Sequence, residues 1–274
     1  MVSLGTFPLL PHAGRFPQKR YFYTLFGRMI NFFVKKRFLA DYLENFVDIH
    51  NHILPGIDDG SDSPETSIKL IRGFAELGVT KFIATPHIMS EYYPNTRQSI
   101  EGALESLREP LLLSGLSGIS IEAAAEHMID DAFEGRLAEG AVLPIRQQYL
   151  LVEMSYLQPS LNFDEAIIQT SNKGFHPILA HPERYAYLHT RMKKYFKYKD
   201  RGILMQLNLL SLGKYYGSQV YKTAITLLEE GLIDFCATDL HNEIHLQGLR
   251  DITITRKQLE LIQPVIRQTI EVFY

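Results

Sequence analysis

The sequence has a single cysteine, Cys236, among 274 residues, and it has no tryptophan. One cysteine excludes a disulfide within the chain, and without paired CxxC motifs a zinc ribbon is excluded too. We therefore expect a protein of a reducing compartment, the cytoplasm. No run approaches the roughly 18 to 20 apolar residues that a membrane-spanning helix needs. The formal net charge of −3 gives no reason to expect a nucleic-acid partner.

Acidic residues are missing from the first 38 positions, where seven Lys and Arg residues alternate with Phe and Tyr, and the first carboxylate is Asp41. We assign residues 1–45 to a basic, aromatic N-terminal extension. A segment of this composition can rest on an anionic membrane, so one expectation is peripheral contact with the inner face of the membrane. The competing interpretations are a disordered tail and a start assigned too early, with Met29 as the initiator.

The remaining residues, 46–274, alternate strand-like and helical patterns and contain no linker. After the first apolar run, Ser63 is suited to cap a helix, Pro64 to begin it and Gly78 to end it. Seven such units with near-continuous apolar strands are typical of an α/β protein with a parallel sheet closed, or nearly closed, into a barrel. The predicted strands are 46–49, 81–85, 119–123, 149–153, 177–180, 203–207 and 233–238, and the predicted helices include 64–77, 99–113 and 219–230.

Histidines and carboxylates follow almost every predicted strand. His50 and His52 are two residues apart on an extended chain, so their side chains share a face about 6.5 to 7 Å apart and can reach one ion. The carboxyl ends of parallel strands meet at one rim of a barrel, so the other donors are expected there too. The predicted metal ligands are His50, His52, Asp59, His87, Glu126, Glu153, His181, Asp239 and His241.

These donors outnumber the four to six ligands of one ion, so two or three divalent ions are expected. Imidazole mixed with carboxylate, without thiolate, suits Mn, Fe or Zn. Ions about 3.5 to 4 Å apart acidify a bridging water into a nucleophilic hydroxide and neutralise a phosphoryl group under attack. The sequence therefore predicts hydrolysis of a phosphate ester.

Covalent phosphatase chemistry is not supported by the sequence. A cysteine-dependent tyrosine phosphatase needs Cys-x5-Arg, but Asn242 is the sixth residue after Cys236, which lies in an apolar strand and is expected in the core. No Gly-x-Ser-x-Gly elbow or phosphate-binding Gly-x4-Gly-Lys loop is present.

Four motifs occur in order along the chain: DIHNHILPGIDDGS at 48–61, TPH at 85–87, HPERY at 181–185 and DLHN at 239–242. Together they resemble the signature of the polymerase and histidinol phosphatase (PHP) superfamily. More narrowly, they are similar to its bacterial protein-tyrosine phosphatases of capsule and exopolysaccharide loci, the CpsB/YwqE kind. The resemblance implies a distorted, TIM-like (β/α)7 barrel and a trinuclear, often manganese-dependent centre. It also implies a substrate, the phosphotyrosine tail of a bacterial tyrosine autokinase, and hence regulation of capsular polysaccharide synthesis.

The resemblance also assigns roles to individual residues. The nine donors would be ligands, with Glu126 as the bridging carboxylate, and Arg184 would clamp the phosphate with a guanidinium fork. His241 or His245 would assist departure of the tyrosinate. Many members carry a second arginine shortly after the last ligand pair, whereas here none occurs before Arg250, so His245 or Arg250 would have to substitute.

Several alternatives remain at this stage. Glu122 competes with Glu126 for the metal, and Arg184 could pair with an acid instead of substrate. His127 is expected on the opposite face, and His176 in a structural role. Exposed tyrosines could anchor a partner or a homo-oligomer; they are Tyr92, Tyr93, Tyr215 and Tyr216.

Two other functions compete with the tyrosine phosphatase. One is a small-molecule phosphatase on the same fold, acting on histidinol phosphate or a nucleotide, which a deep lidded pocket would favour. The other is a non-catalytic, metal-binding module of a polysaccharide assembly complex.

Overall fold

The computed structural model describes residues 36–274. One compact unit spans Arg37 to Tyr274. Residues 37–45, assigned above to the extension, belong to this unit because strand β1 (Arg37–Phe38) pairs with β11 (Thr253–Ile254). The expectation of membrane contact falls largely on residues outside the described part. Within the described part, no helix is long and apolar enough to cross a bilayer.

The seven predicted strands each correspond to an observed strand, and the chain alternates strands with helices as expected. The main strands are β2 (Val47–Asp48), β3 (Lys81–Ala84), β5 (Ser120–Ala123), β7 (Tyr149–Glu153), β8 (His176–Ala180), β9 (Leu204–Asn208) and β10 (Phe235–Ala237). Two further short strands, β4 (His87–Ile88) and β6 (Glu126–Met128), extend β3 and β5 toward the rim. The helices are α2 (Pro64–Ala75), α3 (Arg97–Leu113), α4 (Phe133–Ala138), α5 (Phe163–Asn172), α6 (Met192–Asp200), α7 (Ser218–Glu229), α8 (Glu243–Asp251) and α9 (Arg256–Phe273), with 3-10 turns η2 (Leu39–Tyr42), η3 (Pro182–Arg184), η4 (Ala186–Leu188) and η5 (Leu209–Gly213).

The strands form a distorted (β/α)7 barrel made of two parallel sheets. One sheet has the order β10-β9-β8-β7-β6-β4 and the other β2-β3-β5. Backbone hydrogen bonds from Ala124 to Ala84 and from Glu126 to Pro86 carry the pairing across the break between the sheets. On the other side, a parallel bridge joins Asn51 to Leu240, just beyond the ends of β2 and β10. The rim is therefore held together by the segments that carry the metal-binding motifs.

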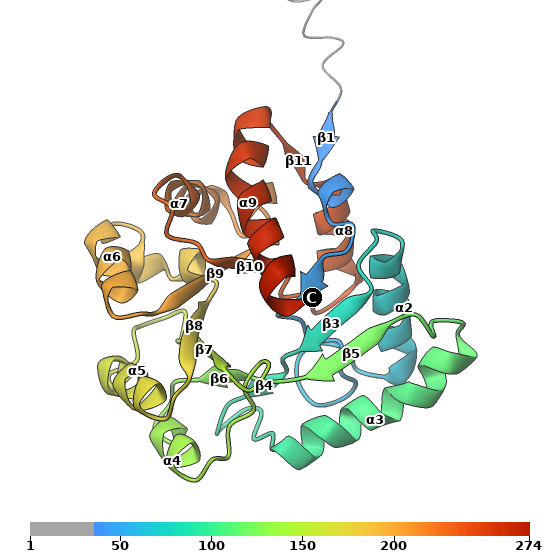
Figure 1. Cartoon of the computed structure of the whole chain (residues 1–274), viewed down its shortest axis with the longest axis horizontal. Coiled ribbons are helices and arrows are strands. Elements are labelled where there is room, and N and C mark those ends of the chain that lie inside the picture. The colour runs from blue at the N-terminus through green and yellow to red at the C-terminus, as the bar shows by residue number, and fades with distance from the viewer. Residues whose placement is uncertain (1–35) are drawn as a thin grey trace, which may run out of the picture. The chain divides into compact units, whose positions relative to one another are not determined.

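Helices surround the strands, as Figure 1 shows for α2 to α7, while α9 crosses them and contacts β2 and β10. Two apolar cores result. A large core lies between strands and helices, and a smaller one fills the inside of the barrel, where Phe273 at the end of α9 packs with Phe235 and Val47. Cys236 is fully buried, as predicted.

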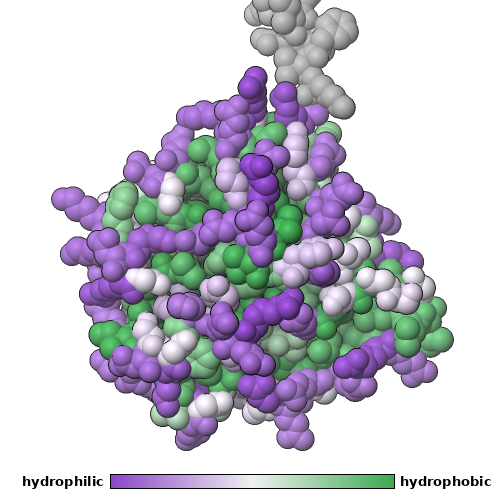
Figure 2. All heavy atoms as spheres, in the orientation of Figure 1, coloured by the Kyte–Doolittle hydropathy of each residue, from purple (hydrophilic) through white to green (hydrophobic). Residues whose placement is uncertain are grey.

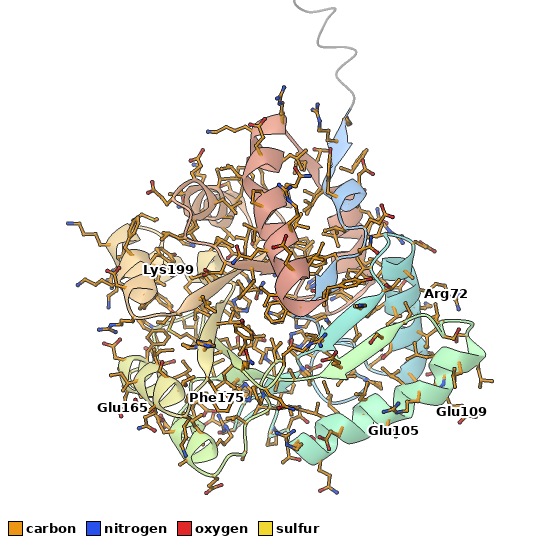
Figure 3. All side chains as sticks on the ribbon, viewed as in Figure 1. Arg72, Glu105, Glu109, Glu165, Phe175 and Lys199 are labelled. Carbon is orange, nitrogen blue, oxygen red and sulfur yellow. The ribbon has the colours of Figure 1, made fainter. Side chains whose placement is uncertain are left out.

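The exposed faces of the helices are polar, and hydrophilic side chains cover much of the face in Figure 2. Glu105 and Glu109 on α3 and Glu165 on α5 lie at the outer edge, away from the strands (Figure 3). Lys199 on α6, labelled in the same view, donates to Asp234 just before β10. These charged groups therefore lie away from the carboxyl ends of the strands.

Candidate metal centre

The structure brings all nine predicted ligands together at the rim. They form four overlapping groups, in each of which one ligand atom per residue lies within 4.8 Å of the others. The groups are His52, Asp59, His87 and His241; His50, His52 and Glu126; His50, His181 and Asp239; and His87, Glu126 and Glu153. Four groups that share members are what a multinuclear centre requires, because neighbouring ions share ligands.

The backbone is unusual where it delivers these ligands. His181 follows β8 with φ 35°, and Asp239 follows β10 with φ 52°, both in the left-handed region that non-glycine residues rarely adopt. Gly60 closes the loop that carries Asp59, and a Cβ there would lie 2.1 Å from the carbonyl oxygen of His52. Only glycine permits this close approach, which holds the loop against the His50–His52 segment.

The spacing of the innermost donors fits an ion. The Nε2 atoms of His50 and His52 are 3.4 Å apart, and Asp239 Oδ1 lies 3.3 Å from each. Two ligand nitrogens, each about 2.1 Å from one tetrahedral ion, are about 3.4 Å apart. A separation of this size between two imidazole nitrogens is longer than a good hydrogen bond but suits a shared metal.

Glu126 belongs to two of the four groups. Its Oε2 is 3.1 Å from His50 Nε2 and 3.2 Å from His87 Nδ1, and its Oε1 is 3.0 Å from His181 Nε2. Glu122 instead pairs with Arg146 and lies outside the groups. The geometry thus favours Glu126 as the bridging carboxylate.

Several buried polar atoms of the candidate ligands make no hydrogen bond of normal geometry among the described residues, although His87 Nδ1 has ion-pair contacts with Glu126 Oε2 (3.2 Å) and Glu153 Oε1 (2.9 Å). These atoms are His87 Nδ1, Glu126 Oε2, Glu153 Oε1 and His181 Nδ1. Buried polar atoms are normally satisfied, and each exception calls for a ligand, ion or water. Their imidazole and carboxylate chemistry fits divalent metal ions.

Without metal, the cluster is held by charge pairing. Burial disfavours the charged form of His87, but Glu153 and Glu126 outweigh it and raise the pKa of His87 to about 9. Burial likewise opposes ionisation of Glu126, yet the neighbouring His50 and His87 hold its pKa well below the usual range. Metal binding would replace these protons.

Two partners of the candidate ligands were not predicted from the sequence. Asp58 Oδ2 lies 2.7 Å from His52 Nδ1, and Gln206 Oε1 lies 2.8 Å from His50 Nδ1. Each leaves the Nε2 of its histidine facing the cluster. The signals were present, since Asp58 adjoins Asp59 and Gln206 interrupts an apolar strand.

Asp58 should therefore orient His52 without binding metal itself. We expect Asp58→Asn to weaken metal affinity about 10- to 100-fold, because partners of this kind fix the tautomer and raise the basicity of a ligand. Metal titration followed by calorimetry measures this. Asp62→Asn is the matched control, since Asp62 in the same loop is exposed and accepts from Thr66. Equal affinities for both variants would show that Asp58 does not orient a ligand.

Arg184 lies beside the cluster and is tied to it by Asp239. Its Nη1 donates to Asp239 Oδ2, whereas Asp239 Oδ1 faces the histidines. The guanidinium lies 4.6 Å from the ring centre of Tyr156 and 4.1 Å from that of Tyr216. Arg184 thus pairs with an acid, as one alternative foresaw, but it also lines the cleft described next.

A cleft of about 1120 Å³ opens onto the cluster. Asp59, His87, Glu153, Asp239 and His241 line it, and so do Arg184 and His245. Burial and the nearby His241 lower the pKa of His245.

Two residues considered above lie elsewhere. Arg250 donates to Gly73 and pairs with Glu76, and it does not line the cleft, so it cannot replace the second arginine. His127, which was expected on the opposite face, is buried and hydrogen-bonded to backbone atoms of Leu151 and Leu143, and it belongs to none of the ligand groups. Of the two candidates for the position of the second arginine, His245 lines the cleft and Arg250 does not.

The sequence is similar to a known family and to several of its members. Residues 46–250 match the family "Capsular polysaccharide synthesis, CpsB/CapC". The chain is 28% identical over 197 residues to the tyrosine-protein phosphatase YwqE of Bacillus subtilis, covering 72% of this chain and 77% of that protein. It is 27% identical over 203 residues to CpsB of Streptococcus pneumoniae, covering 72% and 83%.

A solved structure supports the same relationship. It comes from work on YwqE and CpsB, described as unique metal-dependent tyrosine phosphatases, and it matches with a TM-score of 0.74 and 26% identity over 83% of this chain and 93% of that one. The lactonase Lmo2620 of Listeria monocytogenes matches at 14% identity with a TM-score of 0.51, which shows a shared fold alone. From the family match and the geometry together, the chain belongs to the CpsB/CapC family.

Proposed function

We propose that this protein is a metal-dependent protein-tyrosine phosphatase that acts on the phosphotyrosine tail of a bacterial tyrosine autokinase in the cytoplasm and so regulates capsular or exopolysaccharide synthesis. The observation that carries the proposal is the position of Arg184, which lies in one cleft with the metal-binding cluster and is linked to it through Asp239. A metal cluster beside a guanidinium fork is suited to a phosphate ester.

The nine predicted ligands would hold two or three divalent ions, with manganese as our first choice. When bound, such ions neutralise the charge of a phosphoryl group and acidify water. Arg184 keeps donors beyond the one used by Asp239, and it would hold two equatorial phosphoryl oxygens through the reaction. The aromatic rings of Tyr156 and Tyr216 and the Asp239 carboxylate fix its orientation.

His245 and His241 line the same cleft as Arg184, and either would assist departure of the tyrosinate. The contribution is expected to be small for a tyrosyl substrate, because tyrosinate with a parent pKa of about 10 is already a fair leaving group.

The form of the cleft favours a peptide over a small metabolite. Tyr92 and Leu157 line it and are 71% and 91% exposed, so the described residues around the site do not bury a ligand as a lidded pocket would. The complete donor set and Arg184 favour an enzyme over a non-catalytic metal-binding module.

The first test is phosphate release from a phosphotyrosyl peptide by the purified, manganese-loaded full chain. We expect turnover of the phosphotyrosyl peptide, and turnover of a matched phosphoseryl peptide at least about 100-fold lower, because an alkoxide leaves far less readily than tyrosinate. Faster hydrolysis of histidinol phosphate or a nucleotide would favour the small-molecule phosphatase. No turnover of any of these by metal-replete protein would favour the binding module.

A further inference from the structure

Apolar side chains gather on one wall of the cleft, next to the metal-binding cluster. Leu157 and Leu161 are 91% and 102% exposed, and Tyr92 and Tyr156 are 71% and 41% exposed. All four line the same cleft as His87 and Arg184. We call these four residues, Tyr92, Tyr156, Leu157 and Leu161, the apolar shelf. Single exposed apolar residues are ordinary, whereas several that line one cleft beside a site indicate a binding surface.

The loops that carry the shelf are joined to one another by hydrogen bonds. They follow β4, β6 and β7, and Asp130 joins them. Asp130 Oδ2 accepts from the backbone nitrogen and the hydroxyl of Ser90, and its backbone oxygen accepts from Asn162. Arg136 donates to both Asp130 and Ser90. The shelf is therefore held in place by hydrogen bonds rather than carried on a free loop.

The charge around the shelf selects the kind of partner. Glu91 and Asp131 line the same wall and are exposed, and no ion pair involves either one among the described residues. Within the described lining, Arg184 is the one Lys or Arg, and Asp239 and two tyrosine rings hold it. An acidic peptide segment would be repelled here, whereas a neutral, apolar one would be accepted.

The cleft is large enough to hold more than one substrate side chain. Drug-sized ligands fill pockets of about 300 to 1,000 Å³, and the cleft of about 1120 Å³ exceeds this range. The Tyr156 ring of the shelf lies 4.6 Å from the Arg184 guanidinium, so a phosphotyrosine bound at Arg184 would meet this end of the shelf and a neighbouring side chain of the peptide would reach the rest.

We propose that the apolar shelf is a second substrate subsite, which binds an apolar side chain of the same peptide close to the phosphotyrosine. The inference rests on the proposed function and deepens it, since it names a sequence preference of the substrate. Covering exposed leucine by substrate removes apolar area from water, and about 1.4 kcal/mol of such burial corresponds to a tenfold change in kcat/KM.

The test compares the rates of hydrolysis of a set of phosphotyrosyl peptides. The reference peptide has alanine at the three positions before and the three positions after the phosphotyrosine, and each other peptide replaces one of these alanines with leucine. For the manganese-loaded full chain, we expect kcat/KM for the best leucine peptide to exceed that for the alanine peptide about tenfold. Aspartate at the same position should lower it. In a Leu157→Ser/Leu161→Ser variant, the leucine preference should disappear while hydrolysis of para-nitrophenyl phosphate is unchanged.

The matched control is Leu112→Ser/Leu113→Ser at the end of α3, where both leucines are exposed (67% and 81%) and do not line the cleft. This variant should keep the leucine preference. Equal kcat/KM for all peptides with the wild type, or an unchanged preference in the shelf variant, would overturn the inference while leaving the phosphatase intact. Absence of turnover on para-nitrophenyl phosphate and every peptide would overturn the proposed function itself, and the subsite with it.

Discussion

Replacing Arg184 with alanine is expected to lower kcat/KM for a phosphotyrosyl peptide by about a thousandfold. Removing one well-placed donor costs about 10² to 10³ in rate, and an arginine that neutralises a transferring phosphoryl group is worth 10³ or more. Most of the loss should appear in kcat, because the guanidinium fork is expected to match the planar arrangement of the equatorial oxygens in the transition state better than that of the bound substrate. The measurement is steady-state phosphate release with metal content determined in parallel.

Metal content should not change in this variant, since Asn208 still donates to Asp239 Oδ2. Arg184→Lys should recover little, because an ammonium cannot present a planar fork. Arg250→Ala serves as the control, as Arg250 pairs with Glu76 outside the cleft. A loss of less than tenfold in Arg184→Ala with full metal occupancy would show that Arg184 does not bind the phosphate and is held by Asp239 for structure alone.

Most strands and the start of α2 could be predicted from short-range patterns in the sequence. Strands buried on both faces read as apolar runs, and the Ser63 cap and Pro64 start of α2 were read correctly, with Ser63 accepting from the Thr66 nitrogen. The grouping of the nine donors also followed, because parallel strands place their carboxyl ends at one rim. What carried the prediction was periodicity together with residue type at strand ends.

Other features depend on tertiary contacts that no local pattern encodes. The division into two sheets arises where the chain passes from β3 to β4 and from β5 to β6, and strands as short as His87–Ile88 carry almost no periodic signal. The start of the compact unit at Arg37 depends on pairing with Thr253 and Ile254, far away in sequence. Arg250 lies outside the cleft because α8 directs the Arg250 side chain toward α2, where it donates to the Gly73 carbonyl oxygen.

The same limit applies to the partners of the ligands. Asp58 and Asp59 are adjacent and chemically identical, yet Asp59 faces His87 and His241 while Asp58 faces His52 Nδ1. The sequence shows two acids, and only the turn at Gly60 decides which one faces the cluster. A resemblance to known motifs assigned Asp59 without giving this reason.

Removing the metal should destabilise the protein, and more so at high pH. In the metal-free protein, the pKa of His87 is raised from 6.5 to about 9 by Glu153 and Glu126. The stabilisation from protonated His87 is therefore complete below pH 6.5 and is lost as pH rises through 9. This shift of about 2.5 pKa units corresponds to between about 3 and 4 kcal/mol at most, at about 1.4 kcal/mol per pKa unit.

The metal-bound protein has no such dependence, because the imidazoles bind the ions in their neutral form and the ions neutralise the carboxylates. The difference in Tm between manganese-loaded and EDTA-treated protein should thus widen from pH 6.5 to pH 9, by about 5 to 10 °C at roughly 2 to 4 °C per kcal/mol. Thermal unfolding with one equivalent of metal per site measures this difference in Tm. In a parallel assay, EDTA should abolish phosphate release at every pH. In a His87→Gln variant, the difference in Tm between the two forms should depend less on pH. A difference in Tm that stays constant across this range would mean that metal and protons do not compete for these histidines, and the cluster would then be an ion-paired network rather than a metal centre.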